Sequence, residues 1–130
     1  GPDRAARLDD AGGALAEGVP MAIHSDAPVT ALAPLFTAWC AVNRVSSSGA
    51  RLGTRSHCLT VDQALHAITL GAAYSLKMDH EIGSIEVGKR ADFAILDEDP
   101  YEVAPMELKN IGVTGTIVGG KIHLNTASKT

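Results

Sequence analysis

The sequence is poor in aromatic residues, which occupy 4% of its 130 positions. Because large rings are scarce, a core has to rest on Ala, Val, Leu and Ile, and the hydrophobic fraction of 45% is ordinary for one globular domain. No apolar stretch approaches the ~20 residues that a membrane span requires, so no contact with a membrane is expected. Residues 1–8 carry charges and no apolar run, which excludes a signal peptide there.

Basic runs are also missing. The chain has 11 Lys and Arg against 15 Asp and Glu, and its formal net charge is −4. No partner nucleic acid is therefore expected. The two cysteines, Cys40 and Cys58, form no C-x-x-C pair, and a reduced pair is favoured over a disulfide between them. These features predict a cytoplasmic protein and say nothing about its chemistry.

Helical patterns fill the first part of the chain. Residues 3–17 favour a helix by composition, and residues 32–45 place apolar side chains at helical spacing. The clearest helix covers residues 60–76, because Thr60 and Gln63 form a T-x-x-Q capping box at its start. One short apolar run, Val19 to Ile23, interrupts these helices and is typical of a buried strand of the parallel type.

Strand patterns fill the second part. Residues 82–87 and 91–96 alternate as strands do, and residues 113–118 and 121–124 flank a Gly-Gly pair that is a strong hairpin signal. Residues 125–130 form a polar tail. The organisation is therefore a helical part up to residue 77 followed by a small antiparallel β part.

Three segments carry recognisable motifs. They are V-P-M-A-I-H-S-D-A-P-V at residues 19–29, L-T-V-D-Q-A-L at 59–65, and G-S-I-E-V-G-K-R-A-D-F-A-I-L-D at 83–97, which is followed by T-I-V-G-G-K at 116–121. In this order they resemble the amidohydrolase superfamily, and most closely its amidohydrolase-3 branch. The first resembles the last barrel strand with its Ser-Asp-x-Pro turn. The third is similar to the G-x-[IL]-x-x-G-K-x-A-D-[FL] signature.

The resemblance implies an α/β fragment. Residues 1–77 would be the last strand and helices of a (β/α)8 barrel of a metal-dependent hydrolase. Residues 78–130 would be the C-terminal part of a small β-sandwich, or composite, domain. A full barrel takes about 250 residues. The resemblance also implies an H-x-H metal pair on an earlier strand, and the sequence holds no H-x-H. We therefore expect a C-terminal piece whose active site is incomplete.

Asp26 is the leading site candidate. By position alone, a loop aspartate that forms a turn before Pro28 is favoured. The resemblance implies instead that Asp26 is the last active-site aspartate, which binds the metal and accepts a proton. His24 shares a strand face with Asp26 and is either a substrate contact or a packed barrel residue. The family usually has a small residue at this position. Arg51 and Arg55, in the loop of residues 46–57, are candidates for binding a substrate carboxylate.

Other chemistry-bearing residues are expected to be structural. His57 and Cys58 are adjacent on a loop, and adjacent residues rarely form a site alone. Three more histidines are scattered and share no metal-binding motif: His66, His80 and His123. Gly88 is expected to supply a turn with positive φ, and Asp92 to hold that turn by accepting backbone hydrogen bonds.

The predicted function belongs to the parent enzyme that the resemblance implies. It is a metal-dependent amidohydrolase that acts on non-peptide C–N bonds of a small-molecule substrate with a divalent metal, zinc being favoured. The isolated chain is expected to be inactive. The alternative is a non-enzymatic oligomerising or binding module. Because the apolar strand Val19 to Ile23 lacks neighbours, a homo-oligomer is also expected.

Overall fold

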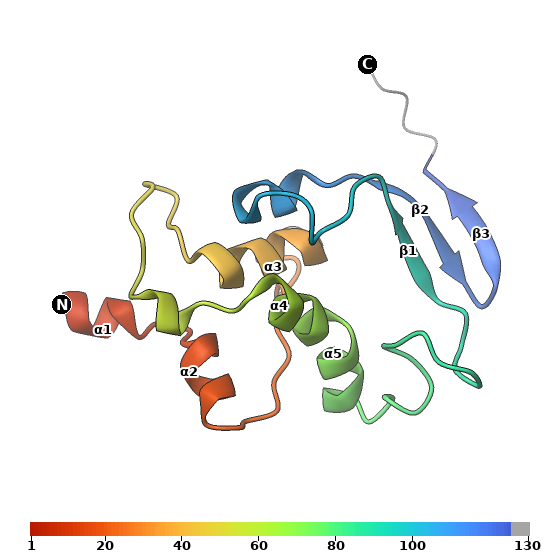
Figure 1. Cartoon of the computed structure of the whole chain (residues 1–130), viewed down its shortest axis with the longest axis horizontal. Coiled ribbons are helices and arrows are strands. Elements are labelled where there is room, and N and C mark those ends of the chain that lie inside the picture. The colour runs from red at the N-terminus through yellow and green to blue at the C-terminus, as the bar shows by residue number, and fades with distance from the viewer. Residues whose placement is uncertain (126–130) are drawn as a thin grey trace, which may run out of the picture.

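The computed structural model describes residues 1–125, and the predicted tail beyond residue 125 lies outside the described residues. The chain is an α/β structure in which helices come first and strands later (Figure 1). The helices are α1 (Pro2–Ala6), α2 (Ala11–Ala16), α3 (Pro34–Asn43), the 3-10 helix η1 (Arg55–His57), α4 (Val61–Ile68), α5 (Leu70–Ser75) and the 3-10 helix η2 (Pro105–Asn110). The strands are β1 (Phe93–Leu96), β2 (Val113–Val118) and β3 (Lys121–Leu124). Within residues 1–125, no helix combines the length and the apolar character that crossing a bilayer requires.

The predicted first helix is two helices, so the prediction of one helix over residues 3–17 was wrong. The chain turns at Asp9, whose φ is +49°. Asp10 then begins α2 as its N-cap, and its Oδ1 accepts a hydrogen bond of 2.8 Å from the backbone N–H of Gly13. An Asp at this position stabilises a helix start, which explains why the break comes before the two glycines.

The predicted helix over residues 60–76 begins as expected but breaks in the middle. The capping box is confirmed: the N–H of Gln63 donates to Thr60 Oγ1 at 3.1 Å, and the N–H of Thr60 donates to Gln63 Oε1 at 2.9 Å. The break lies at Thr69, which has φ −120° and ψ −94°. Its hydroxyl donates to the carbonyl of Leu65 at 2.7 Å, a local bond that competes with regular helix bonding.

Two predicted strands were wrong. The segment from Val19 to Ile23 has no regular secondary structure. The N–H of Val19 donates to the carbonyl of Ala14 at 3.1 Å, and the N–H of Ile23 donates to the carbonyl of Ala67 at 3.4 Å. A strand needs a neighbouring strand for its backbone groups, and the described residues place none beside this segment. Residues 82–87 form bends and irregular backbone after a 3.0 Å bond from the N–H of Ile82 to the carbonyl of Met78.

The small sheet is antiparallel in the order β1-β2-β3, and the predicted Gly-Gly hairpin is confirmed. The two hairpin glycines have φ of +55° and +80°, values that favour glycine. Asp92 Oδ1 accepts a hydrogen bond of 2.6 Å from the N–H of Gly119. The prediction that Asp92 holds the turn at Gly88 was therefore wrong, because its carboxylate holds the β2–β3 hairpin. Gly88 itself has the expected positive φ, at +94°.

The core lies where α3 packs against η2 and α4. Its members are buried and mostly small or aliphatic: Ala38, Trp39, Leu59, Ala64, Ala67, Leu108 and Ile111. Trp39 Nε1 donates a hydrogen bond of 2.9 Å to the carbonyl of Met106, and Lys109 Nζ lies 4.1 Å from the centre of the indole ring. One core therefore includes residues from both sides of position 77, where the sequence divides helical from strand patterns.

Candidate functional site

Asp26 lies in a turn directly after the segment from Val19 to Ile23. Its φ is +52°, a left-handed conformation that Asp tolerates better than most residues. Its backbone N–H donates a hydrogen bond of 3.0 Å to His24 Nδ1, and its carbonyl accepts one of 2.8 Å from the N–H of Val29. Because Nδ1 accepts a bond, a neutral His24 ring carries its proton on Nε2. Among residues 1–125, no donor binds the Asp26 carboxylate, which is exposed.

Asp26 and His24 border one pocket of about 830 Å³, referred to below as the Asp26 pocket. Its walls come from α2 and the linker before it, from the segment after Met21, and from α3. Cys40, on α3, also borders it. Burial raises the pKa of the Cys40 thiol, and the nearby ammonium of Lys109 opposes that rise, so this thiol is a weak nucleophile at neutral pH. The pocket is thus bordered by three acidic residues, Asp9, Asp10 and Asp26, and by the imidazole of His24.

Arg44 is a site residue that the sequence did not reveal. It follows α3 in a left-handed conformation, with φ +46°, and 6% of it is exposed. Its guanidinium donates hydrogen bonds to the carbonyls of Leu52, Ala6, Leu8 and Asp9. The buried cation therefore ties the linker between α1 and α2 to the end of α3, along one wall of the Asp26 pocket. The one feature of the sequence that could have indicated this role is that a charged residue, Arg44, directly follows an apolar helix.

The structure does not bring Arg51 and Arg55 to this pocket. Arg51 Nη1 donates to the carbonyl of Asn43 at 3.4 Å and lies 4.0 Å from Cys58 Sγ. Arg55 is exposed at the start of η1. Neither side chain borders the Asp26 pocket, so the structure gives no support to their predicted contact with a substrate there.

His57 is part of a local capping arrangement. Its Nδ1 accepts a hydrogen bond of 2.9 Å from the N–H of Thr54, and its Nε2 lies 3.7 Å from Asp10 Oδ2. Because Asp10 also caps α2, His57 fastens η1 to α2. These contacts support the expected structural role of His57.

A catalytic zinc takes three protein ligands and keeps one open position. Within the part of the chain that the structure describes, no three His, Cys, Asp or Glu side chains lie close enough together to hold a metal ion. Asp26 offers a carboxylate ligand. His24 Nδ1 already accepts a hydrogen bond from the Asp26 backbone N–H, so only Nε2 of this ring is available to bind a metal. The described residues therefore do not fit a complete zinc site.

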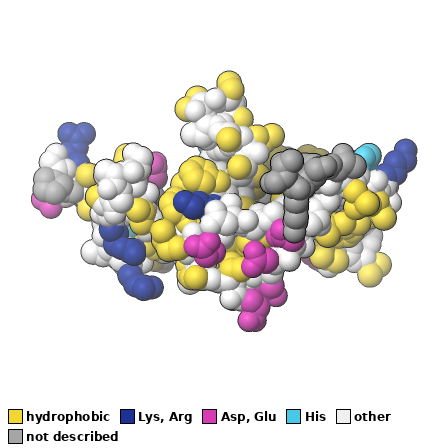
Figure 2. Space-filling model, turned by 90° about the horizontal axis from the view of Figure 1, so that it is seen from above, with side chains coloured by type: hydrophobic (Ala, Val, Ile, Leu, Met, Phe, Trp, Pro, Cys, Tyr) yellow, Lys and Arg dark blue, Asp and Glu magenta, His cyan; other side chains and the backbone are white. Residues whose placement is uncertain are grey.

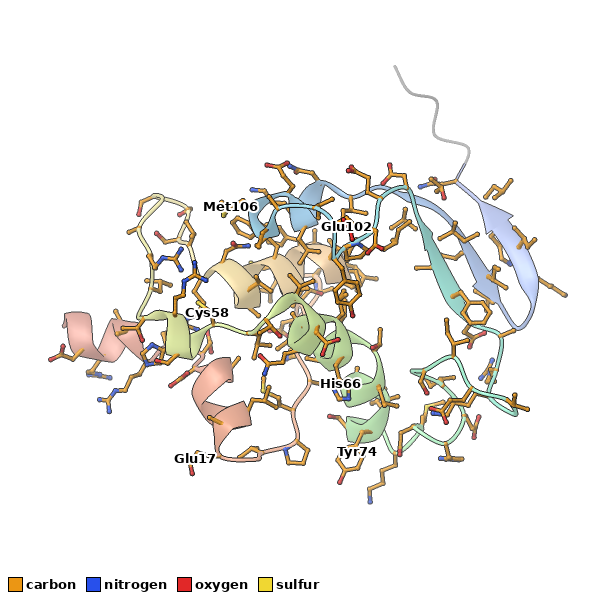
Figure 3. The ribbon with its side chains drawn as sticks, in the orientation of Figure 1. Glu17, Cys58, His66, Tyr74, Glu102 and Met106 are labelled. Atoms are coloured by element: carbon orange, nitrogen blue, oxygen red, sulfur yellow. The ribbon has the colours of Figure 1, made fainter. Side chains whose placement is uncertain are left out.

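A second pocket, of about 690 Å³, lies between α2, α4 and α5. His66 and Tyr74 border it and point from α4 and α5 (Figure 3). At its rim, the Tyr101 hydroxyl donates a hydrogen bond of 3.0 Å to Asp62 Oδ1, and this bond raises the pKa of Tyr101. No sequence motif indicated this pocket, because its walls come from elements that are far apart in the chain.

A model of the amidohydrolase family matches residues 1–123, which is nearly the whole sequence. The chain belongs to the amidohydrolase family. The resemblance seen in its motifs is thereby confirmed.

Individual relatives agree with this assignment. An N-substituted formamide deformylase of Arthrobacter pascens is 38% identical over 106 residues, which are 82% of this chain and 19% of that protein. An imidazolonepropionase of Bacteroides fragilis is 45% identical over 65 residues, 50% of this chain and 16% of that protein. The protein LONG AFTER FAR-RED 3 of Arabidopsis thaliana is 34% identical over 101 residues, 78% of this chain and 17% of that protein. The chain thus spans about a fifth of the length of these relatives, and no solved structure gives a significant match.

Proposed function

We propose that this chain is the C-terminal part of a metal-dependent amidohydrolase that cleaves a non-peptide C–N bond in a small molecule. The family match over residues 1–123 is the observation that carries this proposal. A deformylase of N-substituted formamides, as one relative is named, removes an acyl group from nitrogen, which is cleavage of such a bond. The non-enzymatic module is not favoured, because the matched relatives include named enzymes.

In this proposal the helical part completes a (β/α)8 barrel. The segment from Val19 to Ile23 becomes the last barrel strand once neighbouring strands supply partners for its backbone groups. The exposed turn after it then lies at the carboxyl end of a strand, where enzymes with this barrel keep their active sites. The sheet β1-β2-β3 becomes part of a small β-sandwich domain.

Asp26 is the residue of this chain that we assign to catalysis and to metal binding. Its carboxylate is exposed at the rim of a pocket and is not engaged by any donor in the described part of the chain. A carboxylate there can bind a divalent cation and accept a proton from the attacking water. His24 accepts a hydrogen bond from the Asp26 backbone N–H through Nδ1 and borders the same pocket. We therefore assign the substrate contact to His24 and not to Arg51 or Arg55.

The metal of the proposed enzyme is divalent, and zinc is our choice. When bound, zinc lowers the pKa of a coordinated water towards neutrality. The described residues do not complete such a site, so its other ligands have to come from polypeptide beyond this chain. It follows that the isolated chain is inactive. Two free thiols, Cys40 and Cys58, fit a reducing compartment, and we place the enzyme in the cytoplasm.

The test is to express this chain together with the polypeptide encoded upstream of it. The purified protein should hydrolyse small amides such as N-substituted formamides, lose that activity to a chelator and regain it with zinc. The 130-residue chain alone, assayed beside it, should show no turnover. A longer protein that carries metal yet hydrolyses no C–N substrate would contradict the proposal, and so would full activity in the short chain.

A further inference from the structure

Arg44 is a buried cation that holds backbone rather than another charge. Figure 2 shows Lys and Arg side chains on the surface at the end of the molecule that carries α1, whereas Arg44 is 6% exposed. In the described part of the chain its guanidinium donates four hydrogen bonds, all to backbone carbonyls, and no Asp or Glu forms an ion pair with it. A buried charge usually has a charged partner. Here three of the four acceptors belong instead to one short segment: Ala6, Leu8 and Asp9.

The segment of residues 7–10, called here the α1–α2 linker, has few other bonds to the fold. Among the described residues, its backbone N–H groups donate only to carbonyls of the preceding turn, at 3.2 Å. Its one ion pair with a distant residue joins Asp10 Oδ2 to His57 Nε2 at 3.7 Å. The long-range hydrogen bonds of the linker are therefore those that Arg44 donates to it.

Both sides of this contact border the Asp26 pocket. The α1–α2 linker contributes Leu8, Asp9 and Asp10 to its walls, and Arg44 borders it at the end of α3. Helix α3 itself forms a further wall. The bonds of Arg44 therefore fix the position of one wall of the pocket relative to another.

In the proposed barrel Arg44 joins two neighbouring loops, and this step rests on the proposed function. Helix α2 precedes the last barrel strand, Val19 to Ile23, so the linker that leads into α2 belongs to the loop after the previous strand. Helix α3 and Arg44 follow the Asp26 turn and belong to the loop after the last strand. Loops that follow strands all lie at the carboxyl face of the barrel, where the active site is built. Arg44 thus fastens one active-site loop to the next.

We propose that Arg44 is a positioning residue, which holds the α1–α2 linker in the form that binds substrate. A wall that is already ordered costs less binding free energy than a wall that the substrate has to order. Within the described residues Arg44 makes no hydrogen bond to the Asp26 turn. Its effect is therefore on substrate binding and not on the chemical step. A guanidinium suits this role, because its planar fork reaches several carbonyls at once.

Steady-state kinetics of Arg44→Met, in the longer enzyme that contains this chain, tests the role. Methionine keeps an apolar stem and removes every donor. KM for an N-substituted formamide should rise about tenfold or more, while kcat stays within about threefold of the wild type. Arg44→Lys keeps the charge and most of the packing, so it should fold readily and show the same split to a smaller extent. Arg7→Met removes an exposed cation of the linker that borders neither pocket, and both constants should stay unchanged.

Hydrogen exchange of the same proteins needs no substrate, so it separates this proposal from the proposed function. The hydrogen-bonded amides of residues 7–14 should exchange about tenfold faster in Arg44→Met, while amides of α4 stay unchanged. Unchanged exchange in residues 7–14, an unchanged KM in both Arg44 variants, or a lower kcat at constant KM would each overturn the positioning role. A wild type that hydrolyses no C–N bond would contradict the proposed function instead, and the exchange data would still decide whether Arg44 holds the linker.

Discussion

The backbone of Gly71 approaches the carbonyl oxygen of Met21 so closely that a Cβ at position 71 would lie 2.6 Å from that oxygen. The N–H of Ile23 bonds to the carbonyl of Ala67 one turn away. Helices α4 and α5 therefore hold the segment that leads to Asp26, although this segment has no strand beside it. The position of the candidate catalytic turn depends on this contact.

Gly71→Ala is predicted to destabilise the fold by about 1–3 kcal/mol, because the added methyl group must push the Met21 backbone away. In an ordinary helix the same change stabilises by up to about 1 kcal/mol. The sign of the change in the free energy of unfolding therefore distinguishes the two cases. Urea denaturation of the wild type and of Gly71→Ala measures it. A variant at least as stable as the wild type would show that the two backbones separate easily.

Local patterns in the sequence predicted the structure well where the bonding partners are near in the chain. The capping box of Thr60 and Gln63 spans three residues, and the Gly-Gly hairpin joins adjacent strands. The two wrong strands, at residues 19–23 and 82–87, needed neighbours that the described residues do not offer. A strand is completed by another strand, so an apolar run alone could not decide it.

The candidate site, like the fold, was predictable only where the interacting residues are near each other in the chain. Asp26 and His24 border one pocket, but the strand face on which their predicted proximity rested does not form, and their roles in catalysis stay predictions. Arg44 was missed because its acceptors, among them the carbonyls of Ala6 and Asp9, lie 38 and 35 residues away. Hydrogen bonds between segments so far apart in the chain produce no recognisable spacing of residues in a single sequence.

Tyr101 is predicted to make stability depend on alkaline pH. Its hydrogen bond to Asp62 raises the pKa of the phenol above the ordinary value of 10.0. Because the pKa of Tyr101 is higher in the folded state than in the unfolded state, the stability that this bond contributes is complete below pH 10. It is lost as pH rises through the pKa of the folded state. Thermal melts of the wild type and Tyr101→Phe should therefore differ most below pH 10 and converge above it. A difference that stays constant across this range would show that the bond does not form in solution.

The isolated chain is predicted to bind no stoichiometric zinc, since the described residues provide too few converging ligands. The chain would be purified without chelator, mixed with excess zinc, dialysed, and its metal content counted per chain. The expected value is far below one. A value near one that disappears in Asp26→Ala would instead reveal a site built by this chain alone or between its copies.

The most direct test of the account replaces Asp26 in the longer enzyme that contains this chain. Asp26→Asn should lower kcat by about 100-fold or more, because a carboxylate that accepts a proton is lost. The fold should stay intact, since Asp26 is exposed. Glu102→Gln removes an exposed carboxylate near η2 (Figure 3) that borders neither pocket, and it should leave kcat unchanged. A purified Asp26→Asn enzyme with the kcat of the wild type would contradict the assignment of Asp26 to the active site.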